Sequence, residues 1–308
     1  MSKPTTQDDA PAPLFTEQDV LCRTPVKNRE QLLEAMIRRI AEQHDIGDVG
    51  DILKAVIARE EESSTVITAD VAVPHARLDN IDTARVAVAT SADGIPFRDN
   101  APPVHLVILI LAPSHDPSLY LKVAAAAARL IVTPDFAKNA AACRTPTELV
   151  KFFQRGGMRL PDYVCAADMM IPPAHTLRDT NSVKDAIDLI VRAGISEIPV
   201  VDKEGDLVGV ASADEVLRIC IPEYMLWMED LSSFSNFEPF GTLLRKESST
   251  WLADIMGDDY ASVTVDRPAI AVAEAMARHK TATCYVLDGA KLAGVITLPH
   301  FLNKVFRD

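Results

Sequence analysis

An internal repeat in the C-terminal half is the feature that most constrains how this chain can fold. The triplet Asp-Met-Met at 168–170 recurs as Asp-Ile-Met at 254–256, and Ile-Pro-Val-Val-Asp at 198–202 recurs at the same 86-residue offset as Cys-Tyr-Val-Leu-Asp at 284–288. Self-similarity at a fixed period indicates one structural unit that occurs twice. Each unit has about 55 residues, which is too few to bury a sheet well alone. We therefore expect the two copies to pack together as a pseudo-twofold pair.

The order of patterns within each copy predicts a β-α-β-β-α unit. Each copy is expected to contain a helix with one apolar face, made of Ala186, Leu189, Ile190 and Ala193 in the first and of Val272, Ala275, Met276 and His279 in the second. The helix is followed by a strand, a turn and another strand, which ends at Ser212 or Thr297. An insertion at 221–250 separates the copies and holds Tyr224, Trp227, Phe234, Phe237 and Phe240. These aromatic side chains either pack over a sheet edge or stack on the base of a ligand.

The N-terminal half mixes helical and strand periods, which predicts an α/β (α+β) domain with a mixed sheet. Asn28 is expected to cap a helix whose apolar face is Leu32, Leu33, Met36, Ile37 and Ile40. Further helices are expected at 50–61, 117–132 and 145–153, and strands at 71–73, 86–89 and 104–111. Arg155, Gly156 and Gly157 interrupt the pattern and predict a domain boundary near 155–160.

Composition argues against several classes of function. The net charge of −13 opposes binding to nucleic acid and to anionic lipid, because both require neutralisation of phosphates. The longest apolar run, at 104–112, is interrupted by His105 and falls short of the roughly 18–20 residues that span a membrane. Residues 1–13 lack the pattern of a secretory signal and predict a disordered leader. The five cysteines and seven histidines are dispersed, without metal-ligand spacing, which favours a cytoplasmic protein with reduced thiols.

His75 is distinguished from the other histidines by its context. It follows a strand and Pro74, so its side chain is expected at a strand end, facing solvent or a cleft. An imidazole there is a neutral nucleophile near pH 7, because its unperturbed pKa is about 6.5. Phosphoryl transfer to such a nitrogen needs mainly positioning, with cationic or N–H donors around the phosphoryl oxygens.

The residues around His75 follow a recognisable pattern. Its parts are REE at 59–61, ST at 64–65, VAVPHAR at 71–77, GIPF at 94–97 and the strand at 104–112, which ends before Pro113. These residues resemble the enzyme IIA domain of the bacterial phosphotransferase system, in its fructose, mannitol and nitrogen-regulatory branch. The resemblance covers about residues 16–154. It implies that His75 accepts a phosphoryl group and that Arg59 binds the phosphoryl oxygens through paired hydrogen bonds.

Two departures from the family pattern bear on activity. The stretch Val-Ile-Thr-Ala-Asp at 66–70 lacks the usual glycines, so backbone N–H groups approach a phosphate less closely, and Asp70 adds negative charge. Tyr120 stands where the family often has a second histidine. A tyrosine hydroxyl can hydrogen-bond a phosphate but carries no positive charge. His115 could compensate, whereas His105 is expected to be a hydrogen-bonded core residue.

Two interpretations of His75 therefore stay open. In the first, it is the one histidine that becomes phosphorylated, with Arg59 as the necessary cation and Arg77 as the alternative. In the second, it is a retained residue in a domain that has lost phosphotransfer.

The repeated half resembles a tandem pair of CBS (cystathionine-β-synthase) domains over about residues 161–308. Its specific parts are the Asp-x-Met starts and the runs IPVVD-turn-LVGVAS and YVLD-turn-LAGVIT. The resemblance implies an adenosine-containing ligand, such as AMP, ADP, ATP or S-adenosylmethionine, in the cleft between the copies. It also implies that Ser212 and Thr297 lie at the ligand sites. The group that holds the ribose hydroxyls follows three residues later, here Glu215 in the first copy and His300 in the second.

The roles of these four residues have a structural alternative. Ser212 and Thr297 either only cap the helices that follow, a position that Ser and Thr favour, or cap them and also contact ligand. A carboxylate at Glu215 accepts hydrogen bonds from two ribose hydroxyls, whereas a neutral imidazole at His300 accepts only one. The first copy is therefore expected to bind more tightly. Asp214 could replace Glu215 only with a shift of register.

The expected arrangement is a leader at 1–13, an enzyme IIA-like domain at 14–155, CBS modules at 161–220 and 251–308, and the insertion at 221–250. The first functional hypothesis is a cytoplasmic regulator that senses an adenine nucleotide and signals to phosphotransferase proteins or a membrane transporter. The alternatives are an active phosphocarrier that relays phosphate through His75, and a scaffold in which both sites are degenerate. A homodimer is expected, because a CBS pair exposes apolar helix faces and twofold assembly is the commonest oligomer.

Overall fold

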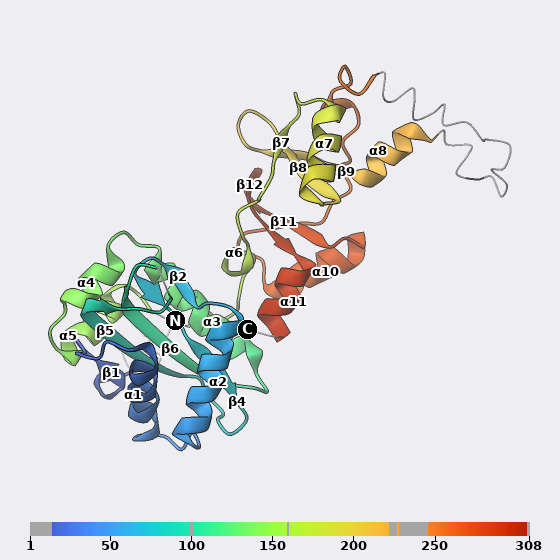
Figure 1. The fold of residues 1–308 in the computed structure, drawn as a ribbon. Helices are drawn as coiled ribbons and strands as arrows, with labels where there is room; N and C mark the ends of the chain where they lie inside the picture. Colours follow the sequence, from blue (N-terminus) through green and yellow to red (C-terminus); the bar gives the residue numbers. More distant parts are fainter. Residues whose placement is uncertain (1–13, 99–100, 159, 222–226, 228–245, 307–308) are drawn as a thin grey trace, which may run out of the picture. The chain divides into compact units, whose positions relative to one another are not determined.

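The computed structural model describes residues 14–98, 101–158, 160–221, 227 and 246–306. The chain divides into two compact units, Met1–Val164 and Cys165–Asp308 (Figure 1). The expected leader and most of the aromatic insertion lie outside the described residues. None of the described helices combines the length and apolarity that crossing a membrane requires.

A six-stranded mixed sheet forms the centre of the N-terminal unit. Its strands are β1 (Val20–Leu21), β2 (Val66–Thr68), β3 (Val71–Ala72), β4 (His75–Leu78), β5 (Arg85–Ile95) and β6 (Val104–Pro113). The strand order is β1-β5-β6-β3-β2, and β4 also pairs with β6. The long strands β5 and β6 are antiparallel, whereas β3 and β4 run parallel to β6. The strands expected at 86–89 and 104–111 are thus confirmed as parts of the central pair.

Both faces of β6 are covered, which explains why this strand is apolar throughout. Its residues alternate between two core clusters, with Leu106, Ile108, Ile110 and Ala112 in one and Val107, Leu109 and Leu111 in the other. Successive side chains of a strand point to opposite faces. A strand that is buried on both faces therefore shows a continuous apolar run rather than an alternating pattern.

The helices of this unit form two layers around the sheet (Figure 1). They are α1 (Arg29–Ala41), α2 (Val49–Glu62), α3 (Pro117–Ile131), α4 (Phe136–Ala142) and α5 (Pro146–Arg155). Residues of α1 and α2 belong to one core cluster, and residues of α3, α4 and α5 belong to the other. Asn28 caps α1 by accepting from the backbone N–H groups of Glu30 and Gln31, and the predicted apolar face is buried. The sequence pattern did not predict the short helix α4.

Two β-α-β-β-α copies make up the C-terminal unit, as the repeat predicts. Copy one contains β7 (Leu177–Arg178), α7 (Val183–Ala193), β8 (Glu197–Val201), β9 (Leu207–Ser212) and α8 (Ala213–Cys220). Copy two contains β10 (Ser262–Thr264), α10 (Ala269–His279), β11 (Thr283–Asp288), β12 (Lys291–Thr297) and α11 (Leu298–Phe306). In each copy the first strand runs parallel to the second, and the second runs antiparallel to the third.

The copies exchange the segments that precede them. The segment before copy one includes α6 (Ala166–Met169) and continues to Ile171, which forms a β-bridge with Val295 of copy two. The segment before copy two includes the 3-10 helix η3 (Leu252–Asp254) and continues to Gly257, which forms a β-bridge with Val210 of copy one. This reciprocal exchange makes the two copies one pseudo-twofold unit.

Two glycines allow the exchanged segments to approach closely. A Cβ atom added at Gly209 would stand 2.7 Å from the Met256 side chain, and one added at Gly294 would stand 2.8 Å from Met170 Sδ. Met256, from the segment before copy two, thus lies against Gly209 of copy one. Met170, from the segment before copy one, lies against Gly294 of copy two. The repeated methionines and glycines therefore belong to the contact between the copies.

Candidate functional site

His75 follows strand β3 and Pro74, as expected, and is also the first residue of strand β4. The chain leaves β3 at Ala72 and continues as β4 at His75, whose Cα pairs with Ile110 in β6. The His75 residue is only 6% exposed. The expectation that its side chain faces solvent is therefore wrong, and the alternative that it faces a cleft stays a prediction. Its pairing with β6, the most deeply covered strand of the sheet, accounts for the burial.

Hydrogen bonding indicates the tautomer of His75. Its Nδ1 lies 3.2 Å from the carbonyl oxygen of Val73. Because a carbonyl only accepts hydrogen bonds, Nδ1 carries the proton and the lone pair of the neutral ring is on Nε2. Nε2 is therefore the nucleophilic nitrogen of this imidazole.

Tyr120 lies against the His75 ring. Its hydroxyl oxygen is 3.4 Å from His75 Nδ1, and the two ring centroids are 4.4 Å apart, with the ring planes tilted by 32°. Tyr120 lies near the start of α3, which Asp116 caps by accepting from the Ser118 N–H. The Ser118 hydroxyl also donates to Asp116 and lowers the pKa of that carboxyl. The structure thus brings together His75 and Tyr120, which are 45 residues apart.

Glu60 is a buried acid that the sequence analysis did not single out, although it is next to Arg59. It is 4% exposed. Its carboxylate accepts from the Thr65 N–H at 3.0 Å, from the Thr65 hydroxyl, and from the Ser64 hydroxyl at 3.1 Å. The Thr65 carbonyl in turn accepts from the Val73 N–H at 2.9 Å. Glu60 thus links the end of α2 to the segment that orients His75. In the sequence, the Ser-Thr pair that follows the acidic end of this helix indicates such a link.

The two candidate cations come from different elements. Arg59 lies in the last turn of α2, and Arg77 lies in β4, two residues after His75. Residues two apart in a strand point to the same face of the sheet. Arg77 therefore shares a face with His75, and its role as the alternative cation stays a prediction beside that of Arg59.

The other residues considered near His75 lie in three different settings. His105 Nδ1 is 3.0 Å from the Ser91 carbonyl oxygen, which confirms the expected hydrogen bond, but the residue is half-buried and does not belong to the core. His115 is exposed in the turn between β6 and α3. Residues 66–70 form β2 and the turn into β3, so the stretch that lacks glycine is a short hairpin.

A cleft opens between the two copies of the C-terminal unit. Its volume is about 430 Å³, and its lining includes Ser212 and Glu215 of copy one and Tyr285 of copy two. Small-molecule sites usually measure about 300–1,000 Å³. Ser212 caps α8, because its hydroxyl oxygen accepts from the Glu215 N–H at 3.1 Å. A Cβ added at Gly257 would stand 3.3 Å from Glu215 Oε1, so the missing side chain leaves room beside this carboxylate.

The equivalent residue of copy two, His300, bonds to the segment that precedes copy one. His300 Nε2 lies 3.0 Å from the Met169 carbonyl oxygen, and Thr297 Oγ1 accepts from the His300 N–H at 3.4 Å. Lys304 Nζ donates to the Asp168 carbonyl at 3.1 Å. These bonds tie α11 to α6, whereas the equivalent helix α8 faces Gly257. Thr297 and His300 are not part of the cleft lining.

Two further predicted residues are found at the surface. Asp214 is exposed and lines the cleft beside Glu215. Trp227, the one described aromatic residue of the insertion, is 82% exposed. Tyr224, Phe234, Phe237 and Phe240 lie outside the described residues.

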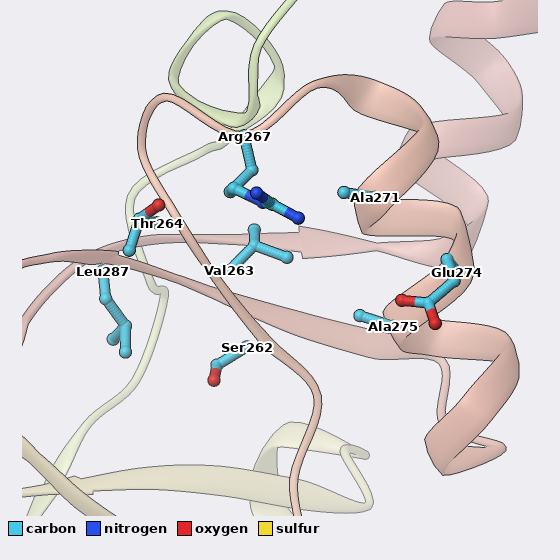
Figure 2. Close-up of a pocket in the computed structure, with 8 residues that line it drawn as sticks. All are labelled: Ser262, Val263, Thr264, Arg267, Ala271, Glu274, Ala275 and Leu287. Atoms are coloured by element: carbon cyan, nitrogen blue, oxygen red, sulfur yellow. The ribbon is translucent and has the colours of Figure 1, made fainter.

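A shallower hollow of about 300 Å³ lies on copy two. Figure 2 shows Arg267 at its upper edge, with Glu274 on the helix at its side. Glu274 is already bound by Arg278, and the Thr264 hydroxyl donates to Asp266. This hollow contains none of the predicted site residues.

Thiol chemistry is disfavoured at the described cysteines. Burial raises the pKa of Cys284 to about 12 and also raises the pKa values of Cys22, Cys143 and Cys165. A raised pKa leaves little of the reactive thiolate near neutral pH. Across the part of the chain that the structure describes, no three His, Cys, Asp or Glu residues are grouped to hold a metal ion.

Comparison with known families matches both units of the chain. Residues 13–156 match the family described as "Phosphoenolpyruvate-dependent sugar phosphotransferase system, EIIA 2". Residues 166–221 and 252–307 each match the CBS domain.

Several relatives match the N-terminal unit. The fructose-specific EIIA component of Haloferax volcanii is 28% identical over 112 residues, which cover 36% of this chain and 73% of that protein. The nitrogen regulatory protein of Bradyrhizobium diazoefficiens is 28% identical over 132 residues, or 42% of this chain and 86% of that protein. The fructose-specific EIIABC component of Bacillus subtilis is 24% identical over 127 residues, which are 41% of this chain. The chain matches only 20% of that larger relative.

Solved structures resemble each unit separately. The nitrogen regulatory protein IIA-Ntr from Neisseria meningitidis has a TM-score of 0.41 and 19% identity, over 44% of this chain and 94% of that one. The CBS-pair protein CBSX2 from Arabidopsis thaliana has a TM-score of 0.36 and 23% identity, over 45% of this chain and 92% of that one.

Proposed function

We propose that this chain, which joins an enzyme IIA domain of type 2 to a pair of CBS domains, is a regulatory protein that binds an adenosine compound in its CBS cleft. The enzyme IIA domain then signals to a partner, either proteins of the phosphotransferase system or a transporter. The observation that carries this proposal is the cleft of about 430 Å³ with the Glu215 carboxylate in its lining.

The chemistry of the cleft fits a ribose. Carboxylate oxygens accept hydrogen bonds from two neighbouring hydroxyls, and such charge-assisted bonds are stronger than neutral ones. Glu215 lies in the first turn of α8, and the Ser212 cap fixes that turn. The backbone that carries this carboxylate is therefore held in place before a ligand arrives.

Calorimetry on the full chain tests this proposal with AMP, ADP, ATP and S-adenosylmethionine as probes. Ala282 is an exposed residue of the cleft lining, so Ala282→Trp fills the cleft. Ala290→Trp is the matched control, because Ala290 is an exposed residue of copy two that does not line the cleft. We expect at least one probe to bind the unmodified chain and the control but not Ala282→Trp. Binding of none of the four, or equal binding by all three proteins, would contradict the proposal.

A second function, phosphate relay through His75, is favoured by the hydrogen bond between Nδ1 and Val73. With the proton on Nδ1, the Nε2 lone pair can attack the phosphorus atom of a donor's phosphohistidine. The new N–P bond forms as the donor's N–P bond breaks. The Arg59 guanidinium offsets the roughly two negative charges of the phosphoryl group.

A phosphoenolpyruvate-driven donor system, followed by mass spectrometry of acid-labile phosphate, tests the relay. We expect label on His75 alone, complete loss in His75→Gln, a large loss in Arg59→Ala, and unchanged label in the control His115→Gln. Label on His105 or His115 would overturn the assignment. Absence of label, under conditions that modify a working enzyme IIA, would leave the sensor as the only function.

A further inference from the structure

We infer that the CBS cleft selects its ligand by charge, because the Glu197 carboxylate makes its inner wall acidic. The cleft then accepts an adenosine compound with a cationic substituent and disfavours one with a di- or triphosphate. This inference rests on the proposed function, since it presupposes that the cleft binds an adenosine compound. S-adenosylmethionine, with its sulfonium and ammonium groups, represents the favoured class, and ATP represents the disfavoured class.

Glu197 stands beside the ribose site. It is the first residue of β8, and its Cα pairs across the strands with Ser212. Paired residues of antiparallel strands have Cα atoms about 4.5–5.5 Å apart. Ser212 in turn caps the helix turn that carries Glu215. Glu197 therefore lies within the length of one nucleoside of Glu215, so the substituent of a ribose that Glu215 binds can reach it.

The Glu197 carboxylate lies at the junction of the two copies. Its Oε1 accepts from the hydroxyl of Thr281, a residue of copy two, at 3.3 Å. Both residues are half-buried and line the cleft. Water screens a half-buried charge less than an exposed one, so this carboxylate acts more strongly on a ligand than a surface acid would.

The positive groups of the cleft lie farther out. Arg218 and Lys280 line it but are exposed, and His279 Nδ1 is 2.7 Å from the Asp259 carboxylate. The half-buried charged residues of the lining, Glu197 and Glu215, are both acidic. A polyphosphate that enters the cleft would face these two carboxylates with its compensating cations only at the rim.

Tyr285 is a second polar residue of this wall and is a neighbour of Glu197. It is 1% exposed and lines the cleft, yet within the described part of the chain its hydroxyl has no hydrogen bond of good geometry. Burial raises its pKa, and the neighbouring Glu197 raises it further, so the hydroxyl stays protonated. A buried polar group without a partner is costly. A ligand that places a polar group between Tyr285 and Glu197 would satisfy both.

The test compares S-adenosylmethionine, AMP and ATP by calorimetry on the full chain and on Glu197→Gln. The glutamine keeps an oxygen for the Thr281 hydroxyl but removes the charge. We expect the unmodified chain to bind S-adenosylmethionine at least about tenfold more tightly than ATP. Glu197→Gln should weaken the former and strengthen the latter, each by about tenfold. The matched control is Glu204→Gln, at an exposed acid outside the cleft, which should change neither affinity.

Tyr285→Phe gives a second test, in which a loss of affinity can be distinguished from a folding defect. Because the hydroxyl has no good partner in the empty cleft, its removal should leave the unfolding midpoint in urea unchanged or slightly raised. Affinity for S-adenosylmethionine should nevertheless fall several-fold, because the ligand loses a hydrogen bond.

The failure of this inference is distinguishable from failure of the proposed function. Preference for ATP or AMP, with affinities that Glu197→Gln leaves unchanged but Ala282→Trp abolishes, would overturn the charge selection and keep the cleft as the ligand site. No binding of any probe would overturn both.

Discussion

The two CBS copies share one topology but differ at the place where a ligand would bind. Their contacts with each other are equivalent, since Met170 covers Gly294 just as Met256 covers Gly209. Their cleft positions are not equivalent, because Glu215 faces a glycine whereas His300 bonds to the Met169 carbonyl. The symmetric contacts hold the pair together, and the asymmetric ones distinguish the two positions that are proposed to bind ligand. The two copies thus share one scaffold and differ in the surroundings of Glu215 and His300.

The largest effect is expected on the outer helices, where the copies are again alike. Leu217 of α8 and Leu302 of α11 are at equivalent positions and are 48% and 43% exposed. We expect a homodimer that buries these helices. Changing both leucines to Asp should raise its dissociation constant by at least about 100-fold, because charges would replace apolar contacts in the interface.

Analytical ultracentrifugation measures this dissociation. The unmodified chain should sediment at twice its mass of 33.5 kDa, and the double variant as a monomer. Ile67→Asp, at a 52% exposed apolar residue of the N-terminal unit, is the control and should remain dimeric. A monomeric unmodified chain at high concentration would contradict the prediction.

The contact between the copies should respond equally on its two sides. Gly209→Val and Gly294→Val each insert a side chain where a methionine of the other copy's leading segment stands. Overpacking of this kind should lower the free energy of unfolding by about 2 kcal/mol in each variant. Urea unfolding followed by circular dichroism measures the loss, with Ala253→Val at an exposed residue as control. A lower free energy of unfolding in only one of the two glycine variants would show that the two contacts are not energetically equivalent.

Ligand binding should instead reveal the asymmetry. Glu215→Ala removes two charge-assisted hydrogen bonds to a ribose and should weaken binding of the preferred probe by about 10- to 30-fold. His300→Ala should leave the affinity nearly unchanged, because His300 lies outside the cleft lining. Calorimetry on both variants decides the matter. If only the histidine change abolished binding, the functional copy would be the second one.

The smallest effect concerns the helix caps, where the copies also differ. Ser182 caps α7 in a reciprocal arrangement with Asp185, whereas α10 begins after Pro268 without a side-chain cap. Ser182→Ala should therefore cost about 1 kcal/mol of stability, and Pro268→Ala should remove no cap. Thermal unfolding at pH 7 measures this difference.

The effect of the Ser182 cap should also depend on pH. The Ser182 backbone N–H, the Asn181 amide and the Ser182 hydroxyl all donate to Asp185 and lower its pKa below its ordinary value, and Ser182→Ala removes the part that the hydroxyl contributes. The stabilisation is then complete above the unfolded pKa of about 3.9 and is lost as the pH falls through the folded pKa. The difference between the unmodified chain and Ser182→Ala should shrink below about pH 4. A difference that stays constant down to pH 3 would show that the bonds to Asp185 contribute little.

Local patterns in the sequence determined much of the fold. The repeat predicted two copies, and Asn28 and Thr145 marked helix starts that the structure confirms. These features depend on residues within one or two turns of each other, so their periodicity and capping chemistry are visible in the chain itself. The apolar run at 104–112 likewise indicated a buried strand, because covering both faces leaves no polar position.

Only the tertiary structure decided the surroundings of the functional residues. His75 is buried because β4 pairs with β6, and its partner Tyr120 comes from a helix 45 residues away. Glu197 meets Thr281 across 84 residues, and His300 bonds to Met169 across 131. Such long-range contacts produce no periodic pattern in the sequence, because each of these residue types is compatible with many different neighbours. The contacts of a histidine or a glutamate at such a position therefore depend on which distant backbone the fold brings opposite it.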